Sequence, residues 1–517
     1  MKKLKKIILI PLLLLNASCY FDMERDNSSD PDSDNFVSPA VAADFTASGT
    51  EGNARLTVGF TDHSFGDIAA WEWDFDNDGI IDSTEQNPVC TYNTAGTYSV
   101  KLKVWESRWL VSDEKVMSNY IEVKVGYPVM SIVKNDFDGA KSVSAADVDG
   151  DGNMDIIAAS YWEGEIIWFE NTGTSWIEHK IIENAFCFWS VIPADIDGDG
   201  DIDFISAGPY SYSMGIYWWE NHREDGGSWK DVWTPHAVDA SFAGAHSVQA
   251  ADMDGDGDLD IAGSSYEDNY NSGQNSEISW WENTAGNASA WTKHKLTTDN
   301  IEADFKGITR LCIADPDADG DFDIIYTENN KGKISMLENR KGEIVDWKDN
   351  FTEHTIDGTF STAEAVYSAD IDGDGDFDII GISYGTWNSS LGIYENSNVC
   401  WWENTNSSSW GKHIVNNESL DGGRTVIAKD IDGDGDIDIA TAASNSDTVI
   451  WWENTNGAGN SWTEHIINMH FHSAYSLDAA DIDNDGDMDI LGASMGNWLS
   501  DDNYYYLSQI AWWEIIY

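Results

Sequence analysis

A nine-residue acidic motif recurs seven times in the C-terminal three-quarters of the chain, and this repetition limits the possible folds more than any other feature. The motif has the form Asp-x-Asp-x-Asp-Gly-(Asp/Asn)-x-Asp with small variations, and its copies start 48 to 63 residues apart. The first residues of the copies are Asp147, Asp195, Asp252, Asp315, Asp370, Asp430 and Asp481. Because periods of this length mark repeat architectures, we expect an array of equivalent units.

A second motif follows each acidic motif and has an aromatic or apolar pair before Glu, as in Trp218-Trp219-Glu220-Asn221, and Asn follows the Glu in the first six copies. Each repeat also contains four short runs of β-forming residues, separated by turn residues. In the first repeat we predict strands at Ser142–Ala146, Ile156–Ser160, Ile166–Glu170 and Trp176–Ile182. Four strands per repeat at this period predict a propeller blade, with the tryptophan pairs packed between blades.

The last repeat stops after Trp512-Trp513-Glu514 and lacks a fourth strand. The segment Pro128–Val133 lies as far before Asp147 as the fourth strands lie before the next acidic motif. We therefore expect it to complete the last blade and close a ring of seven, which removes exposed sheet edges. The predicted fold class is all-β: a seven-bladed β-propeller with calcium loops, preceded by an Ig-like domain.

The acidic motif predicts a calcium loop in every blade. A calcium ion takes about six to eight oxygens, which side chains at positions 1, 3, 5 and 9 and the carbonyl of position 7 can supply. The glycine at position 6 permits the sharp turn: Gly152, Gly200, Gly257, Gly320, Gly375, Gly435 and Gly486. Ordinary acidic turns are the alternative, but seven loops with four carboxylates each would repel themselves without a cation.

The predicted metal-ligand residues, in chain order and loop by loop, are Asp147, Asp149, Asp151, Asn153 and Asp155; Asp195, Asp197, Asp199, Asp201 and Asp203; Asp252, Asp254, Asp256, Asp258 and Asp260; Asp315, Asp317, Asp319, Asp321 and Asp323; Asp370, Asp372, Asp374, Asp376 and Asp378; Asp430, Asp432, Asp434, Asp436 and Asp438; Asp481, Asp483, Asp485, Asp487 and Asp489.

The repeats of residues 127–517 resemble the FG-GAP/VCBS family, whose best-known member is the propeller of the integrin α-subunit. Trp-Trp-Glu-Asn stands where integrins have Phe-Gly and Gly-Ala-Pro, so the chain is more similar to the bacterial branch. The resemblance implies partner binding on the face opposite the calcium loops.

Residues 39–126 resemble a PKD domain, an Ig-like β-sandwich, through Trp71–Asp76, Asn87–Tyr92 and Gly96–Val104. Alternating apolar residues in Tyr98–Val104 predict a half-buried strand. The segment Asp74–Asp82 matches the acidic motif, and an eighth calcium site there stays open.

The first residues predict export to the cell envelope. Residues 1–18 have a basic start and a short apolar run typical of a secretory signal, and Leu15–Cys19 resembles a bacterial lipobox, which implies a lipid on Cys19. Asn16 is unusual there, so a plain signal peptide is the alternative. Residues 19–38 are predicted to be an acidic flexible tether. We expect an outer-membrane lipoprotein, at the cell surface or facing the periplasm, held to the membrane by its N-terminal lipid.

The formal net charge of −64 argues against nucleic acid as a partner, because phosphates would be repelled. The remaining variable positions predict where a ligand binds. The residue six before each acidic motif differs from blade to blade, whereas the residue four before is always Val or Leu. These candidate ligand-binding residues are Lys141, Trp189, His246, Thr309, Glu364, Arg424 and Tyr475.

Varied polar and aromatic groups around one channel mouth are typical of a specific ligand site. Aromatic residues between the second and third strands, such as Trp162 and Trp387, would suit sugar rings. The leading hypothesis is a monomeric, non-catalytic protein that binds carbohydrate or an extracellular protein there. A polysaccharide lyase or sugar dehydratase is the first alternative. Lys141 or Arg424 would hold a carboxylate, and His246, His472 or Tyr475 would be the base. A structural adhesin or scaffold is the second.

Overall fold

The computed structural model describes residues 41–515 except 54–55, 93–95, 107–110, 125–127, 184, 186, 209–214, 224–228, 267–275, 299–306, 345–346, 390–392, 396, 406–408, 500–503 and 507. The predicted signal peptide, Cys19 and acidic tether lie outside these residues. The chain forms two compact units, the first chiefly before Ile121 and the second chiefly from Glu122 onward. Within the part of the chain that is described, no helix is long and apolar enough to cross a membrane.

The N-terminal unit is a β-sandwich. One sheet has the order β1 (Phe45–Ala47), β3 (Leu56–Asp62), β5 (Val89–Tyr92), and the other has the order β2 (Glu51–Asn53), β7 (Ser112–Lys124), β6 (Gly96–Glu106), β4 (Ile68–Asp74). Val100, Leu102 and Val104 are fully buried on alternate positions of β6, which confirms the predicted half-buried strand. Phe45 and Phe60 pack against Trp73 at ring-centroid distances of 5.1 and 5.5 Å.

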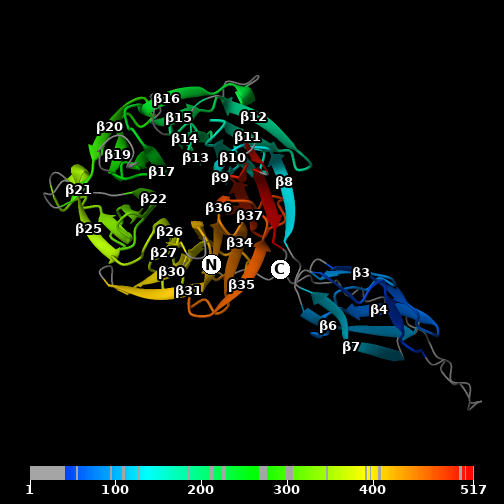
Figure 1. Ribbon diagram of the computed structural model, residues 1–517. Helices are drawn as coiled ribbons and strands as arrows, with labels where there is room; N and C mark the ends of the chain where they lie inside the picture. The colour runs from blue at the N-terminus through cyan, green and yellow to red at the C-terminus, as the bar shows by residue number, and fades with distance from the viewer. Residues whose placement is uncertain are drawn as a thin grey trace, which may run out of the picture. The chain divides into compact units, whose positions relative to one another are not determined.

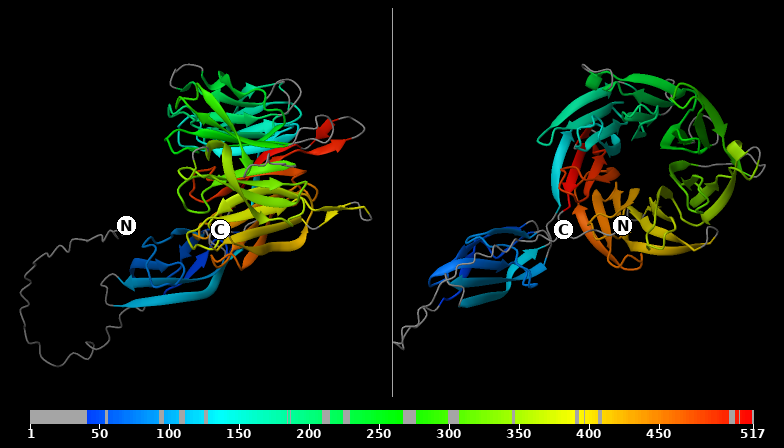
Figure 2. Two further views of the ribbon diagram at one scale, coloured as in Figure 1. Left: turned by 90° about the vertical axis from the view of Figure 1, so that its left-hand side faces the viewer. Right: turned by 180° about the vertical axis from the view of Figure 1, so that it is seen from behind.

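The C-terminal unit is built from sheets of four main strands, arranged around a central axis as propeller blades (Figures 1 and 2). The first three blades contain β9 (Ala140–Ala146), β10 (Asp155–Ser160), β11 (Ile166–Asn171) and β12 (Trp176–Ile182); β13 (Ser190–Ala194), β14 (Asp203–Ala207), β15 (Ile216–Glu220) and β16 (Thr234–Asp239); β17 (Ala245–Ala251), β18 (Asp260–Ser265), β19 (Glu277–Asn283) and β20 (Trp291–Lys295). The four strands predicted in the first repeat agree with β9–β12 to within two residues at either end.

The next three blades contain β22 (Ile308–Ala314), β23 (Asp323–Glu328), β24 (Lys333–Glu338) and β25 (Asn350–Asp357), with β21 (Thr297–Thr298) added at the outer edge; β26 (Ala363–Ala369), β27 (Asp378–Ser383), β30 (Ser397–Asn404) and β31 (Trp410–Leu420); β32 (Gly423–Lys429), β33 (Asp438–Ala443), β34 (Thr448–Asn454) and β35 (Trp462–Asn468). A small hairpin, β28 (Thr386–Asn388) with β29 (Ile393–Glu395), extends from the fifth blade.

The last blade joins the two ends of the C-terminal unit. It contains β36 (Ala474–Ala480), β37 (Asp489–Ser494), β40 (Gln509–Glu514) and β8 (Val129–Asn135), with a hairpin of β38 (Asn497–Leu499) and β39 (Tyr504–Tyr506). Strand β8 pairs antiparallel with β40, Ser131 opposite Trp512, as the sequence predicted for Pro128–Val133. The pairing covers the outer edge of β40 with an N-terminal strand, which hides one sheet edge.

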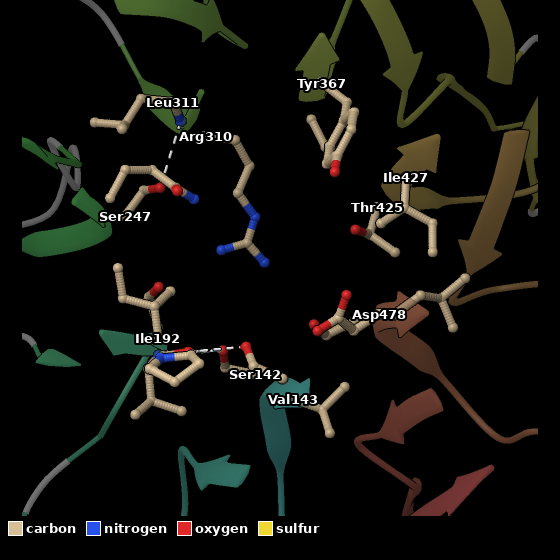
Figure 3. A pocket seen from close by; sticks show the side chains of 18 of the residues that line it. Ser142, Val143, Ile192, Ser247, Arg310, Leu311, Tyr367, Thr425, Ile427 and Asp478 are labelled. Carbon is tan, nitrogen blue, oxygen red and sulfur yellow. Dashed lines mark hydrogen bonds between the residues drawn. The ribbon is translucent and has the colours of Figure 1, made fainter. Parts of the chain in front are cut away.

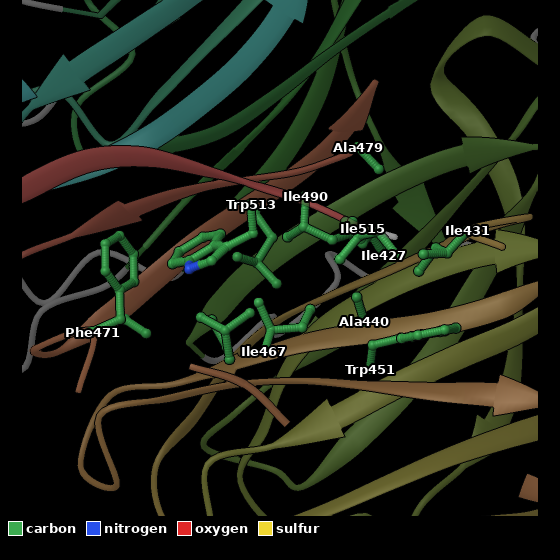
Figure 4. Close-up of a cluster of buried hydrophobic side chains, with 14 of the residues drawn as sticks. Ile427, Ile431, Ala440, Trp451, Ile467, Phe471, Ala479, Ile490, Trp513 and Ile515 are labelled. Carbon is green, nitrogen blue, oxygen red and sulfur yellow. The ribbon is translucent and has the colours of Figure 1, made fainter. Parts of the chain in front are cut away.

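The hydrophobic core lies between blades, and the aromatic pairs build it. Successive side chains of a strand point to opposite faces, so the two members of a pair enter two different interfaces. Trp451 of the sixth blade and Trp513 of the seventh share one cluster with Ile427 and Ile490 (Figure 4). Trp401 and Trp452 meet in the same way between the fifth and sixth blades. The predicted packing role of the tryptophan pairs is therefore confirmed.

The asparagine that follows the Glu in the first six repeats is a second connection between blades. Its backbone N–H donates to the last aspartate of its own acidic loop, and its side-chain amide donates to the preceding blade. Asn454, for example, donates to the carbonyl of Ile371 at 2.9 Å. Equivalent bonds to the preceding blade come from Asn171, Asn221, Asn283, Asn339 and Asn404. The motif thus stabilises both the loop and the blade interface.

Candidate functional site

The seven acidic loops have one backbone design. The amide of the position-6 glycine donates to the position-1 aspartate in every loop, at 3.0 to 3.1 Å. These glycines have φ between 93° and 102°, a range that residues with a Cβ rarely adopt. Aspartates at position 5 accept the amide two residues later, as from Asp201 to Asp199. The curl turns the remaining carboxylate oxygens toward one another.

The last aspartate of each loop is buried at the start of the second strand. Asp438 accepts the amides of Ile431 and Asn454 and is 1% exposed. Burial raises the pKa of five of these carboxyls to about 7: Asp155, Asp260, Asp378, Asp438 and Asp489. Burial likewise raises the pKa of Asp203 to about 8. A carboxylate held in this environment requires a compensating positive charge.

The fourth loop departs from this design because its second residue is Pro316, which has no N–H. The Oδ2 atom of Asp323 consequently has no hydrogen-bond partner, although it is buried. Burial raises the pKa of Asp323 to about 9, the highest among the seven equivalent aspartates.

The loops fit a divalent cation. Among the residues that the structure describes, nine groups of at least three acidic, histidine or cysteine side chains place ligand atoms within 4.8 Å of one another, and one of these groups is Asp147, Asp149 and Asp155. Several carboxylate oxygens of the described loops are buried without a hydrogen-bond partner, including Oδ1 of Asp195, Asp370 and Asp430. Hard oxygens that converge and lack donors are the set that calcium prefers.

Two lysines enter acidic loops from the neighbouring blade, which the sequence analysis did not predict. Lys230 Nζ lies 2.7 Å from Asp149 and 2.8 Å from Glu170, and Lys348 Nζ lies 2.9 Å from Asp254 and 2.7 Å from Glu282. Each lysine belongs to a 3-10 turn, η2 (Trp229–Asp231) or η3 (Trp347–Asp349). The shared Trp-Lys-Asp sequence was the available signal. The first and third loops therefore carry a competing cation.

Two of the predicted position-7 residues also have cationic side-chain partners. Asp201 pairs with Arg223 at 2.6 Å, and Asp321 pairs with Lys341 at 3.0 Å. In these two loops the carboxylate of position 7 faces a basic residue, which leaves the backbone carbonyl as the available ligand.

The loop in the N-terminal unit shares the backbone design of the propeller loops. The amide of Gly79 donates to Asp74 at 3.0 Å, and the amide of Phe75 donates to Asp82 at 2.6 Å. Asp74, Asp76 and Asp78 form one of the groups of converging ligand atoms.

The seven candidate ligand-binding residues come together around the central axis, and they contact one another in sequence. Lys141 lies over the rings of Trp189 and Tyr475, with Nζ 4.4 and 3.7 Å from their centroids. Trp189 packs on His246 at 4.3 Å, and His246 Nδ1 is 2.7 Å from the carbonyl of Thr309.

The other half of this set completes the circuit. Arg424 forms an ion pair with Glu364 at 2.7 Å and lies 5.0 Å from the ring centroid of Tyr475. Thr309 reaches the fifth blade through a 3.3 Å bond to the carbonyl of Ala363. We call the seven residues the polar ring.

The polar ring is more buried than a set of free ligand groups would be. Five members are less than 9% exposed: Lys141, His246, Thr309, Glu364 and Tyr475. Burial, together with Arg424, lowers the pKa of Lys141 well below its usual value. Burial and Arg310 do the same for the pKa of His246. The sequence predicted the convergence of these residues but not their mutual pairing.

Exposed aromatic side chains flank the polar ring on the face opposite the acidic loops. Tyr161 contacts both Trp162 and Trp189, at centroid distances of 4.7 and 5.0 Å. Trp162 is 52% exposed, and Trp387 in β28 is 56% exposed. Tyr384 lies under Arg424 at 4.2 Å. Tyr161 and Tyr384 thus place aromatic rings in direct contact with members of the polar ring.

A cavity of about 540 Å³ occupies the central channel on the acidic-loop side of the polar ring (Figure 3). At one end the cavity is lined by the residues that directly follow members of the polar ring in the sequence, such as Ser142 after Lys141. At the other end it is lined by Leu259 in the third acidic loop. The lining comes from the innermost strand of every blade.

The fold and these loops define a β-propeller protein whose blades carry candidate cation sites. Residues 147–206, 195–263, 315–381 and 430–492 match the family described as FG-GAP-like repeat, and residues 36–117 match the PKD domain. The chain therefore carries FG-GAP repeats behind a PKD domain, the combination of a surface or adhesion type of β-propeller protein.

One solved structure similar to the N-terminal unit is the PKD1 domain from Vibrio cholerae metalloprotease PrtV. It is 32% identical, covers 17% of this chain and 99% of its own, and has a TM-score of 0.14. No curated protein matches the chain.

Proposed function

We propose that this protein is a calcium-stabilised surface lipoprotein that binds carbohydrate through the propeller face opposite the acidic loops. The observation that carries the proposal is the exposure of two tryptophans, Trp162 and Trp387, between the second and third main strands of the first and fifth blades. Aromatic faces next to hydrogen-bonding groups suit the apolar faces and hydroxyls of sugar rings. A protein partner on the same face is the second occupant that this surface would accept.

Calcium is the proposed structural cofactor. The converging aspartates, the unpartnered buried oxygens and the raised pKa values of the last loop aspartates support it. Extracellular modules bind calcium with a Kd of roughly 10⁻⁴–10⁻³ M, so millimolar calcium outside a cell would fill such loops. Each ion would connect the first and second strands of its blade. The geometry of Asp74–Asp82 supports an eighth site of the same kind.

The binding proposal is tested with a panel of neutral and acidic polysaccharides and the full chain in calcium buffer. Trp162→Ala and Trp387→Ala should each weaken binding to the recognised glycan by about three- to tenfold, because each removes an aromatic platform. Phe377→Ala is the matched control, since Phe377 is 45% exposed but lies in an acidic loop on the other face. Equal effects of all three substitutions, or no glycan bound, would contradict the carbohydrate proposal.

One observation favours the enzymatic alternative. Burial lowers the pKa of both Lys141 and His246, and Nζ of Lys141 lies 3.7 Å from the ring centroid of Tyr475. Perturbed groups of this kind occur at catalytic sites. A lyase would release an unsaturated uronate product, which absorbs ultraviolet light, and His246→Ala would abolish its formation. Binding without product supports the receptor.

The lipid anchor is proposed from the sequence around Cys19. Cys19→Ser should release the protein from membranes, measured by fractionation and by incorporation of labelled fatty acid. Retention of both the label and the membrane association would contradict the proposal.

A further inference from the structure

One arginine projects into the central cavity among small residues. The positions that follow the polar ring on the seven innermost strands are Ser142, Ser190, Ser247, Arg310, Ala365, Thr425 and Ser476. Arg310 on β22 alone of these carries a charge, and its side chain extends toward the channel centre (Figure 3). Packing does not require a long cation at this position, since the other blades do without one.

The guanidinium of Arg310 is unpaired. Among the residues that the structure describes, its backbone bonds with Thr327, but no hydrogen bond or ion pair involves its side chain. The nearby acid Glu364 is engaged by Arg424 at 2.7 Å. The cavity carboxylate, Asp478, instead accepts the amides of Ala145 and Ala479 at 3.0 and 2.8 Å. Among the described residues, the guanidinium donors of Arg310 therefore lie in the cavity without a hydrogen-bond acceptor, and both oxygens of the cavity carboxylate Asp478 already accept backbone amides.

The charge around Arg310 is positive in a chain of strongly negative charge. Arg310 acts electrostatically on Lys141 and His246, and Arg424 acts on both as well. Among the described residues, Glu364 is the one carboxylate that acts electrostatically on Lys141 or His246 in the same way. The thiol of Cys187 also acts on Lys141. A chain with net charge −64 thus keeps, among its described residues, an arginine without an ion-pair partner in its central cavity. An anionic group is the complement that this arrangement lacks.

The rest of the lining indicates what the anion is attached to. Hydroxyl groups of Ser190, Thr425 and Ser476 line the same cavity, together with Tyr367 of β26 and Asp478 of β36 (Figure 3). Such groups donate to and accept from hydroxyls rather than apolar surfaces. The volume of about 540 Å³ is within the range of small-molecule sites.

We propose that the central channel binds a polyhydroxylated carboxylate of the uronic-acid type, with its carboxylate on Arg310 and its hydroxyls on the serine and threonine side chains. This site is separate from the aromatic face of the proposed receptor, because the polar ring lies between them. It takes either a free sugar acid or the end of an acidic oligosaccharide, since both present the same carboxylate and hydroxyls.

The proposal is tested by titration calorimetry with the full chain in calcium buffer. Glucuronate and galacturonate are the probes, glucose and galactose the neutral controls, and a short uronate oligomer separates a free acid from a chain end. We expect both uronates to bind and the neutral sugars not to bind. Arg310→Gln should weaken uronate binding by about tenfold to a hundredfold, because a charge-assisted bidentate contact is lost.

Arg340→Gln is the matched control, since Arg340 pairs with Glu343 away from the channel. Arg310→Lys, which keeps the charge but not the planar fork, should bind with intermediate affinity and serves where the Gln variant does not fold. Competition by acetate would identify the carboxylate as the recognised group. Absence of uronate binding to the native chain, or equal binding by the native chain and the folded Arg310 variants, would overturn the proposal. Trp162→Ala tests the aromatic face independently, so failure of one site does not imply failure of the other.

Discussion

Individual residues make the seven loops unequal, although their motif is the same. Pro316 removes a donor from the fourth loop, and Lys230 and Lys348 bring a cation to the first and third. The sequence predicted the loop ligands because they recur at fixed spacing. It did not predict the lysines, because their contacts cross from one blade to the next and occur in two blades only. The same reason explains the pairing within the polar ring, whose members are far apart in the chain.

Removing a loop lysine should tighten calcium binding. Lys230→Met deletes the cation that lies 2.7 Å from Asp149, so the first loop would attract calcium more strongly, by about fivefold or more. Calorimetric titration of the chelator-treated protein measures the weakest class of sites. Lys293→Met is the control, because Lys293 pairs with Asp239 and Glu277 outside the loops. Unchanged or weaker calcium binding in the Lys230 variant would contradict the role of the lysine as a competitor.

At the scale of elements, periodicity decided how well the sequence predicted the structure. Trp451 and Trp452 are adjacent on one strand, so their side chains point to opposite faces and pack in the two neighbouring blade interfaces. This alternation can be predicted from the sequence alone. The histidine of the fourth strand stacks on the first aromatic residue and pairs with the following Glu, as His465 does with Trp451 and Glu453. The hydrogen bond of the asparagine across the interface was not predictable, because it depends on how close the blades approach.

Loss of one interface asparagine should destabilise the propeller. Asn454→Ala removes donors to the carbonyls of Ile371 and Ile437 and leaves buried acceptors unpaired. We expect a decrease of about 1–3 kcal/mol in the free energy of unfolding, measured in urea with calcium present. Asn456→Ala is the control, because that side chain is exposed and bonds chiefly to Asn460. A decrease of the same size in both variants would argue against the interface bond.

At the scale of the whole molecule, the acidic loops contain 34 of the 92 Asp and Glu residues, which is about half of the charge of −64, and this concentration of charge is the reason for the proposed need for calcium. Chelation should lower the Tm by about 10 °C or more, since seven loops would lose the cation that offsets their mutual repulsion. Differential scanning calorimetry in calcium and in chelator measures the shift, and magnesium replacement tests the choice of ion. An unchanged Tm in chelator would contradict a structural role for calcium.

The pH dependence of the chelated protein provides the sharper test, because its sign differs from that of most proteins. The buried aspartates have pKa values of about 7 to about 9 in the fold, as at Asp438 and Asp323, against about 3.9 in the unfolded chain. Between these values the folded chain holds protons that the unfolded chain has released, so stability falls as the pH rises. Below the pKa of an aspartate in the unfolded chain, the carboxyl is protonated in both the folded and the unfolded chain, so stability no longer depends on pH through these groups.

In chelator the Tm should therefore decrease by about 5 °C or more from about pH 5 to about pH 8, with the fourth loop still losing stability up to about pH 9 because of Asp323. In saturating calcium the decrease should largely disappear, because the ion stabilises the carboxylate form of every loop. Asp323→Asn removes one of the titrating groups and should reduce the decrease above about pH 7. A Tm in chelator that stays constant or rises over this range would show that the loop aspartates do not bind protons in the folded chain at these pH values. The electrostatic reason for a cation in each blade would then be lost.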